Sequence, residues 1–168
     1  MLAKPIFQID MALGYVAWAL CVTRYVWPRL RSMERADALH AIATVHSFRF
    51  FGLAFLLPGF VGPALPGAFA TPTAYGDLVT ALLAMSVLLT ARKHVFFLPL
   101  AWVFNVFGAA DLIMATVQAI RVDLPSVAGQ LGAAYAIPML YVPLLFITHV
   151  VAFRLLLRPA YVPARSVA

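Results

Sequence analysis

Five apolar segments, each close to the length needed to cross a lipid bilayer, dominate this sequence. A transmembrane α-helix needs about 20 predominantly apolar residues. Only 11% of the 168 residues are charged, whereas soluble domains carry about 25%. We therefore expect an all-α integral membrane bundle of five transmembrane helices, forming a single domain over residues 1–168. The expected helices cover about residues 7–27, 38–60, 76–91, 95–119 and 133–157.

The distribution of lysine and arginine predicts the orientation of this bundle. Cytoplasmic loops of membrane proteins carry an excess of these two residues. Only Lys4 and Arg121 flank the apolar segments on one side. This asymmetry places the N-terminus outside and the C-terminus in the cytoplasm, and the short loops and alanine-rich spans suggest the bacterial inner (plasma) membrane. The cations expected on the cytoplasmic side are Arg24, Arg29, Arg31, Arg35, Arg92, Lys93, Arg154, Arg158 and Arg165.

The connections between the segments predict further features of the fold. The break between the third and fourth segments, Arg92 to His94, is short, so these helices should form an antiparallel hairpin. Residues 61–75 carry no charge and include three prolines and two glycines. We expect them to form a non-helical apolar loop that caps the bundle. Pro138 and Pro143 should kink the fifth helix, because each removes a backbone hydrogen bond.

A cation lies well inside the second apolar segment, where Arg49 follows His46 by three residues. A charged side chain at mid-membrane costs about 2.5–3.5 kcal/mol on insertion scales. Residues three apart share one face of a helix. Counting about 1.5 Å of rise per residue from the expected helix ends puts Asn105 and His149 at a similar depth. The sequence therefore predicts a polar site between the second, fourth and fifth helices.

Each of these residues also has a structural interpretation. Arg49 could form an ion pair with Asp111, which bridges the second and fourth helices, or could contact a ligand directly. His46, Asn105 and His149 could serve only as interhelical hydrogen-bonding groups. Asp77 follows Gly76 at the expected start of the third helix, where a carboxylate caps free amides and favours the helix dipole.

Several functions fit this pattern, and the sequence leaves open whether any reaction is catalysed. The first is the handling of a small molecule, proton or ion at His46, Arg49, Asn105, Asp111 and His149, with Arg49 holding an anionic group and a histidine moving protons. The second is a b-type haem electron-transfer protein with His46 and His149 as axial ligands. The third is a structural or assembly subunit of a membrane complex. A non-haem metal site with Asp111 is short of ligands.

Other classes find little support. The net charge of +6 arises from cations in short loops rather than from a basic patch with exposed aromatics, so nucleic acid is not an expected partner. Cys21 is the single cysteine, which excludes an internal disulfide or a thiolate metal cluster. Phosphate-binding, dinucleotide and zinc-hydrolase motifs are not found. The bilayer is the expected partner, and a transporter with so thin a bundle should work as a homo-oligomer.

Overall fold

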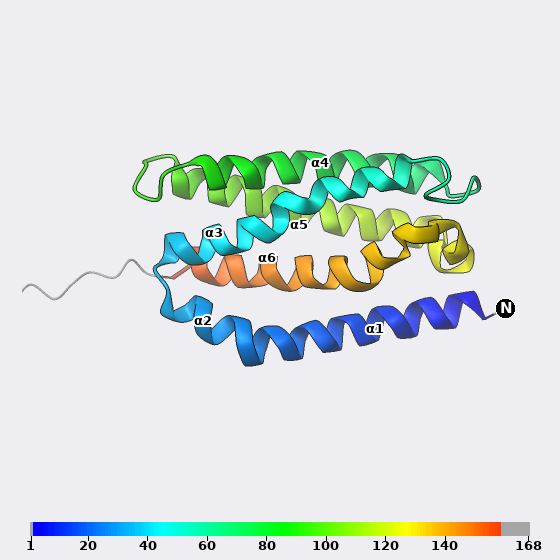
Figure 1. The fold of residues 1–168 in the computed structure, drawn as a ribbon, viewed down its shortest axis with the longest axis horizontal. Coiled ribbons are helices and arrows are strands. Elements are labelled where there is room, and N and C mark those ends of the chain that lie inside the picture. Colours follow the sequence, from blue (N-terminus) through cyan, green and yellow to red (C-terminus); the bar gives the residue numbers. More distant parts are fainter. Residues whose placement is uncertain (1, 159–168) are drawn as a thin grey trace, which may run out of the picture.

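The computed structural model describes residues 2–158, which form a bundle of long helices running roughly parallel to one axis (Figure 1). Five helical spans are long and apolar enough to cross a membrane. The predicted all-helical class and the number of spans are thereby confirmed. The spans are Ala3–Ser32, Arg35–Leu56, Gly67–Leu89, Phe97–Arg121 and Ile137–Leu156.

The first span lies at the edge of the bundle (Figure 1) and has three parts. It consists of α1 (Ala3–Cys21), the π-helical turn η1 (Val22–Val26) and α2 (Trp27–Ser32). Only Phe7 and Gly14 are buried in α1. A helix that exposes nearly all of its apolar side chains is suited to lipid rather than to water.

The second span changes its helical form where the polar residues lie. The helix α3 (Arg35–His46) continues without a break as the 3-10 helix η2 (Ser47–Leu56). A 3-10 helix of ten residues is unusual, because most run for only three or four residues and longer ones often mark functional positions. Side chains three residues apart are eclipsed in a 3-10 helix, so Arg49 and Gly52 lie on one face of η2.

The third span is longer than the sequence predicted, and the expectation of a loop over 61–75 is wrong for most of that range. The helix α4 begins at Gly67 and runs to Leu89. Pro66 precedes it in an extended conformation, as suits a residue at a helix start. Pro72 lies inside α4, where the environment of a membrane bundle tolerates proline. The first turn is held inward by Phe69, which is 4% exposed.

The helices α4 and α5 (Phe97–Arg121) form the predicted antiparallel hairpin (Figure 1). The chain then forms the 3-10 segment η3 (Leu124–Tyr135), the π-helical turn η4 (Ile137–Tyr141) and α6 (Val142–Leu156). Of the two prolines predicted to kink the fifth helix, Pro138 lies within the π-helical turn that joins η3 to α6, where the helix departs from α geometry. Pro143 lies in the first turn of α6.

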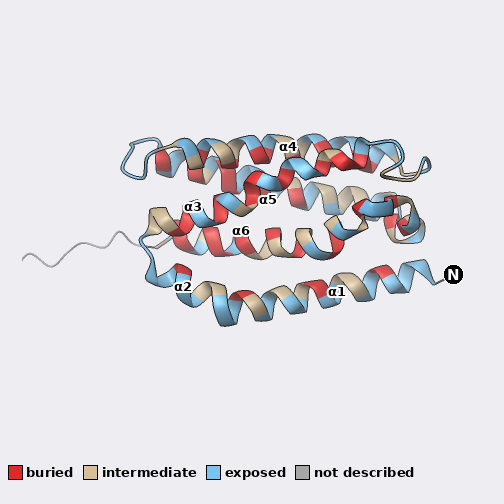
Figure 2. Cartoon of the chain, viewed as in Figure 1, coloured by how far each residue is buried: buried red, intermediate tan, exposed pale blue. Residues whose placement is uncertain are grey.

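Buried residues occur along the whole length of the bundle (Figure 2), and the buried hydrophobic ones form two clusters. The alanine-rich cluster lies toward the α2–α3 end and includes Ala38, Ala84 and Ala152, all fully buried. The phenylalanine-rich cluster lies toward the N-terminal end and includes Phe7 and Phe55. The polar residues of the bundle interior lie between these two clusters along the helices.

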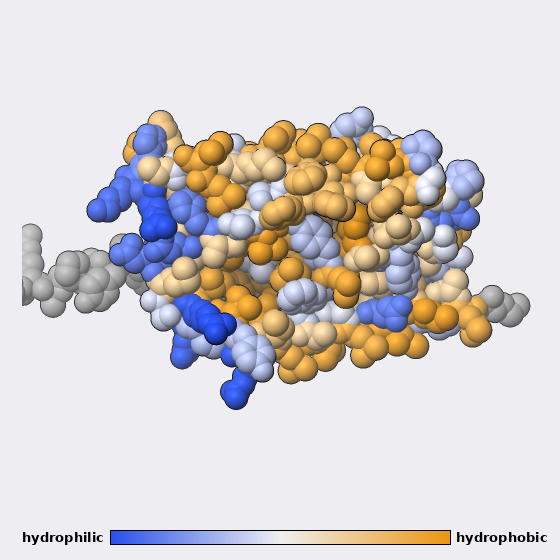
Figure 3. Space-filling model, viewed as in Figure 1, coloured by the Kyte–Doolittle hydropathy of each residue, from blue (hydrophilic) through white to orange (hydrophobic). Residues whose placement is uncertain are grey.

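On the face shown in Figure 3, the most hydrophilic side chains gather at one end of the molecule, and hydrophobic side chains cover most of its middle. That end contains α2, the α4–α5 turn and the end of α6 (Figure 1), from which most of the arginines come. It is fastened by ion pairing of Arg92 with Asp37 at 2.6 Å and by a hydrogen bond from Arg35 to Arg158 O at 2.5 Å. Arg165, predicted to belong to this group, lies outside the described residues.

Candidate functional site

Arg49 lies at the centre of the polar interior, and its guanidinium is fully engaged. Its Nε donates to Asp77 Oδ1 at 2.8 Å, and its Nη2 donates to Asp111 Oδ2 at 2.5 Å. Nη2 is also 2.8 Å from Asp77 Oδ1. Nη1 donates to Gly108 O at 3.1 Å and lies 3.4 Å from His149 Nε2. Each of the three nitrogens therefore has an acceptor within the protein, and two carboxylates already pair with the guanidinium. Direct contact of Arg49 with a ligand stays a prediction.

The ion pair between Arg49 and Asp111, one of the two predicted roles for this arginine, is present. The side chain of Arg49 is 0% exposed and that of Asp111 is 12% exposed. Breaking such a pair by removing one partner typically costs about 3–5 kcal/mol, because a buried charge is left uncompensated.

Asp77 was missed as a member of the site, and its predicted role as a helix cap is wrong. Because α4 begins at Gly67, Asp77 lies in the middle of the span rather than at its start. Its side chain is 9% exposed. The signal that could have identified it is that residues 67–76 are uncharged and extend the third apolar segment to ordinary membrane-spanning length.

Three glycines allow the backbones to approach the cluster closely. A Cβ on Gly52 would collide with Asp77, one on Gly76 with Asp111, and one on Gly108 with the His149 ring at 2.7 Å. Small residues commonly allow close helix packing in membranes. Here they also leave room for polar side chains between η2, α4, α5 and α6.

His149 is held between two polar partners. Its Nδ1 lies 2.7 Å from Asn105 Oδ1, and its Nε2 faces Arg49 Nη1. Arg49 can only donate, so Nε2 accepts and Nδ1 carries the proton that is donated to Asn105. These contacts describe a neutral imidazole with its proton on Nδ1.

His46 is fully buried and, among the described residues, has no acceptor for a second ring proton, so the neutral ring is favoured over a buried imidazolium. Thr148 Oγ1 donates to Leu144 O at 2.8 Å, so the 2.9 Å contact of His46 Nε2 with Thr148 Oγ1 requires a proton on Nε2. Its Nδ1 then carries a lone pair, and within residues 2–158 this atom and Asn105 Nδ2 have no hydrogen-bond partner. The five residues predicted as a site, His46, Arg49, Asn105, Asp111 and His149, therefore lie together, joined by Asp77.

The two histidines do not fit the haem alternative in this arrangement. The centroids of the His46 and His149 rings are 4.2 Å apart, so the rings are in direct contact. Axial ligands must approach iron from opposite faces of a porphyrin, which would have to lie between them. The non-haem metal site, with His46, His149 and Asp111 as ligands, is not formed either. No group of three His, Cys, Asp or Glu side chains placed to hold a metal ion occurs in the described part of the chain.

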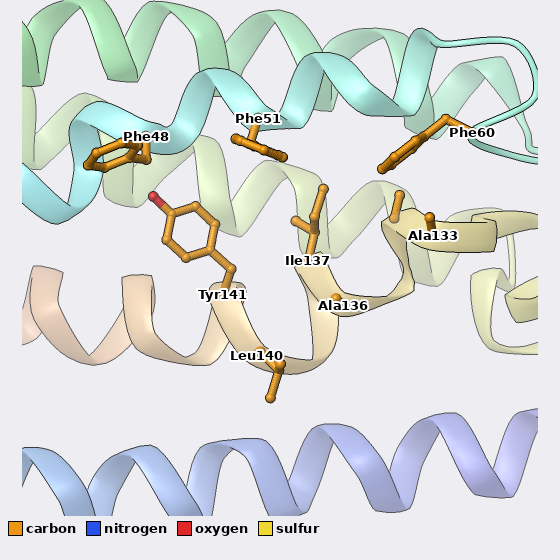
Figure 4. A pocket seen from close by; sticks show the side chains of 9 residues that line it. Phe48, Phe51, Phe60, Ala133, Ala136, Ile137, Leu140 and Tyr141 are labelled. Atoms are coloured by element: carbon orange, nitrogen blue, oxygen red, sulfur yellow. The ribbon is translucent and has the colours of Figure 1, made fainter.

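A separate pocket of about 390 Å³ lies between η2 and the η3–η4 region (Figure 4). Its lining is apolar apart from Tyr141, whose hydroxyl donates to Val45 O, near the end of α3, at 2.6 Å. Phe48 and Phe51 at its border are both more than half exposed. The lining of this pocket contains no charged side chain.

At the N-terminal end of the bundle, Asp123 lies in the turn between α5 and η3. Among the described residues it accepts hydrogen bonds from Ser126 Oγ and from Lys4 Nζ at 3.0 Å. The Ser126 hydroxyl, with Lys4 in addition, lowers the pKa of the Asp123 carboxyl. Both Lys4 and Asp123 are about half exposed.

Comparison with known families gives a match over residues 6–157 to the family described as Domain of unknown function (DUF8737). The chain belongs to this family. No curated protein and no solved structure matches it. For this member of the family, function has to be argued from the charge and geometry of the interior.

Proposed function

We propose that this is a multi-pass membrane protein that binds and releases a proton at a cluster formed by Arg49, Asp77 and Asp111, and that this proton is used in handling a small molecule. The observation that carries the proposal is that one buried guanidinium is shared by two carboxylates. Both carboxylates lie within apolar helical spans.

The charge balance of the cluster favours one bound proton. With both carboxylates ionised, one positive and two negative charges leave a net charge of −1. An uncompensated charge in a low-dielectric interior is costly. The neighbouring imidazole of His149 is neutral by its hydrogen bonds, and burial without an acceptor for a second proton among the described residues favours the neutral form of His46. A proton on either carboxylate makes the cluster neutral, and its release restores the negative charge.

The orientation and location predicted from the sequence complete the proposal. The N-terminus lies outside, the C-terminus in the cytoplasm, and the membrane is the bacterial inner membrane. Support comes from the gathering of hydrophilic side chains at the end that contains α2 and the α4–α5 turn (Figure 3), since an excess of cations marks the cytoplasmic side.

Infrared spectroscopy of the purified protein in detergent tests the proton site. We expect a carboxylic acid band at neutral pH that decreases when the pH is raised. Asp77→Asn and Asp111→Asn should each abolish the band, because each leaves a neutral Arg–Asp pair. Asp37→Asn is the matched control, because Asp37 pairs with Arg92 in the α3–α4–α5 end region and should leave the band unchanged.

The outcome that would overturn the proposal is a protein without any carboxylic acid band across the accessible pH range. The cluster would then hold its net charge permanently and act in folding alone. This structural role is the second candidate function, and the close approach of Gly52, Gly76 and Gly108 to the cluster favours it. A structural cluster would lose stability on mutation but would exchange no proton.

A further inference from the structure

A cavity of about 570 Å³ runs between α1 and the body of the bundle, and it ends at the charged cluster. Its α1 wall is one helix face, formed by residues such as Phe7, Met11 and Tyr15. Opposite, α4 contributes Phe69, Thr73 and Asp77, which are spaced by four residues and so follow one stripe of that helix. Most of the remaining lining is apolar, with side chains from η2, α5, η4 and α6, including Phe55, Leu112, Ala115, Ala119, Pro138 and Val142.

The deep end of the cavity holds an unpartnered hydroxyl beside the carboxylate. Thr73 is 7% exposed, and its Oγ1 has no hydrogen-bond partner within residues 2–158. The other buried threonines of the described chain behave differently. Thr80 donates to Gly76 O and Thr148 donates to Leu144 O, in each case the carbonyl four residues earlier in the helix. A buried hydroxyl without a partner is costly, so a ligand that pairs with Thr73 would be stabilised there.

The other end of the cavity opens where Lys4 and Asp123 form an exposed ion pair at 3.0 Å. An exposed pair of this kind contributes little stability, so it can separate to admit a ligand. The cavity therefore has a polar rim, an apolar wall and a deep end with a carboxylate and a free hydroxyl. This order of polar and apolar lining along the cavity fits an elongated molecule with an apolar body and one polar group at its inner end.

The charge of the cluster decides the sign of that polar group. Each nitrogen of Arg49 already has an acceptor within the protein, whereas Asp77 lines the cavity and belongs to a cluster with excess negative charge. We propose that the cavity binds a lipophilic primary amine in its ammonium form, which donates hydrogen bonds to Asp77 and to Thr73 Oγ1. This inference rests on the proposed proton site and names the class of its small molecule.

The ammonium and the proton would compete for the same negative charge. When the cluster carries a proton, entry of R–NH3+ displaces that proton to solvent as H+, and the bound ammonium neutralises the cluster instead. No bond other than the carboxyl O–H breaks, so charge and atoms balance. The groups that face Asp77 or line this cavity and can carry charge are Arg49, Asp111, His149, Tyr15, Lys4 and Asp123, with Tyr141 and His46 nearby.

Calorimetric titration of the full-length protein in mild detergent with adamantylamine tests this inference, with empty micelles as the blank. Titrations in two buffers of different protonation enthalpy give the number of protons released. We expect release of about one proton per amine bound, as linkage requires. Adamantanol and adamantane carboxylate have the same apolar body, and both should bind at least about tenfold more weakly, since hydrogen bonds to charged groups contribute most.

Two variants test separately the carboxylate and the hydroxyl at the deep end of the cavity. Asp77→Asn should weaken amine binding by about tenfold or more and abolish proton release. Thr73→Val keeps the cluster intact and should weaken binding by about tenfold, because it removes one hydrogen bond that a charged donor makes to an uncharged acceptor. Thr116→Val is the matched control, because Thr116 also lines the cavity but its hydroxyl already donates to Leu112 O. It should leave the affinity unchanged.

Equal binding of the three adamantane compounds would overturn the inference, because the cavity would then recognise only apolar shape. Absence of amine binding, in a protein that still shows the carboxylic acid band, would overturn it while the proton site stands. Amine binding without proton release would contradict the exchange. Equal effects of Thr73→Val and Thr116→Val would contradict the assigned orientation of the amine.

Discussion

The two halves of the bundle interior are packed in different ways. Toward the α2–α3 end, small residues such as Ala38, Ala43, Ala84 and Ala152 are fully buried, and the helices meet closely. Toward the N-terminal end, a cavity of about 570 Å³ separates the helices, and Phe7, Phe55 and Phe69 are part of its lining. The charged cluster lies where the two halves meet. The comparison suggests that one half holds the helices together while the other leaves room for a ligand.

The difference follows from how α1 packs. It buries only Phe7 and Gly14, and a Cβ on Gly14 would collide with Met139 O. At Gly14 the backbone of α1 therefore comes close to that of η4. Away from that point, the cavity separates α1 from α4 and α5. A weakly packed helix is also the part of a structure that opens most readily.

The largest expected effect comes from removing the charge at the boundary between the halves. Arg49→Ala leaves Asp77 and Asp111 without their partner and should reduce the free energy of unfolding by about 3–5 kcal/mol. Arg49→Lys keeps the charge but cannot reproduce the forked contacts, so its loss should be intermediate. Thermal unfolding in detergent measures both. Arg92→Ala, in a half-exposed pair, is the control, and an equal loss there would contradict the central role of Arg49.

A matched pair of substitutions tests the packing difference directly. Ala152→Leu adds volume to the close-packed half and should destabilise the protein by about 1–3 kcal/mol. Ala119→Leu adds the same volume to the cavity wall and should change stability little. Chemical unfolding of the two variants gives the comparison. Equal losses of stability in the two variants would indicate that neighbouring side chains fill the cavity in solution.

A smaller effect is expected from the hydrogen bond that orients His149. Asn105→Ala removes the acceptor of the Nδ1 proton, and interhelical hydrogen bonds in membranes contribute about 0.6–1.7 kcal/mol. Stability should fall by about that amount. Nitrogen NMR of labelled histidine should show His149 losing its preference for the Nδ1-protonated tautomer. An unchanged tautomer would mean that Arg49 alone orients the ring.

The smallest effect is expected at the exposed rim of the cavity. In the folded state Ser126 and Lys4 lower the pKa of Asp123, so its contribution is present above the ordinary aspartate pKa of about 3.9 and is lost as the pH falls through the lowered value. Asp123→Asn should therefore lower the melting temperature slightly near neutral pH, and the difference should vanish in strong acid. Added salt should also reduce it. A difference that grew in acid would contradict this assignment.

The number of helical spans and the presence of a polar interior could be predicted from the sequence, because both depend on local properties. Runs of apolar residues specify membrane-spanning helices whatever their neighbours are. His46 and Arg49 stand out within such a run, and distance along the helix gave their depth. The boundary of the third helix could not be predicted as well. Prolines near its start resembled a loop, and this error hid Asp77.

The sequence by itself determined that the chain forms five apolar helices with ionisable groups among them, since the bilayer leaves a polar backbone few alternatives. Only the tertiary structure decided that one arginine serves two carboxylates, that His46 and His149 lie in contact, and that a cavity leads to Asp77. These features depend on the rotation and spacing of helices far apart in sequence. The cavity in particular depends on the spacing between packed helices, which cannot be read from any single segment of the sequence.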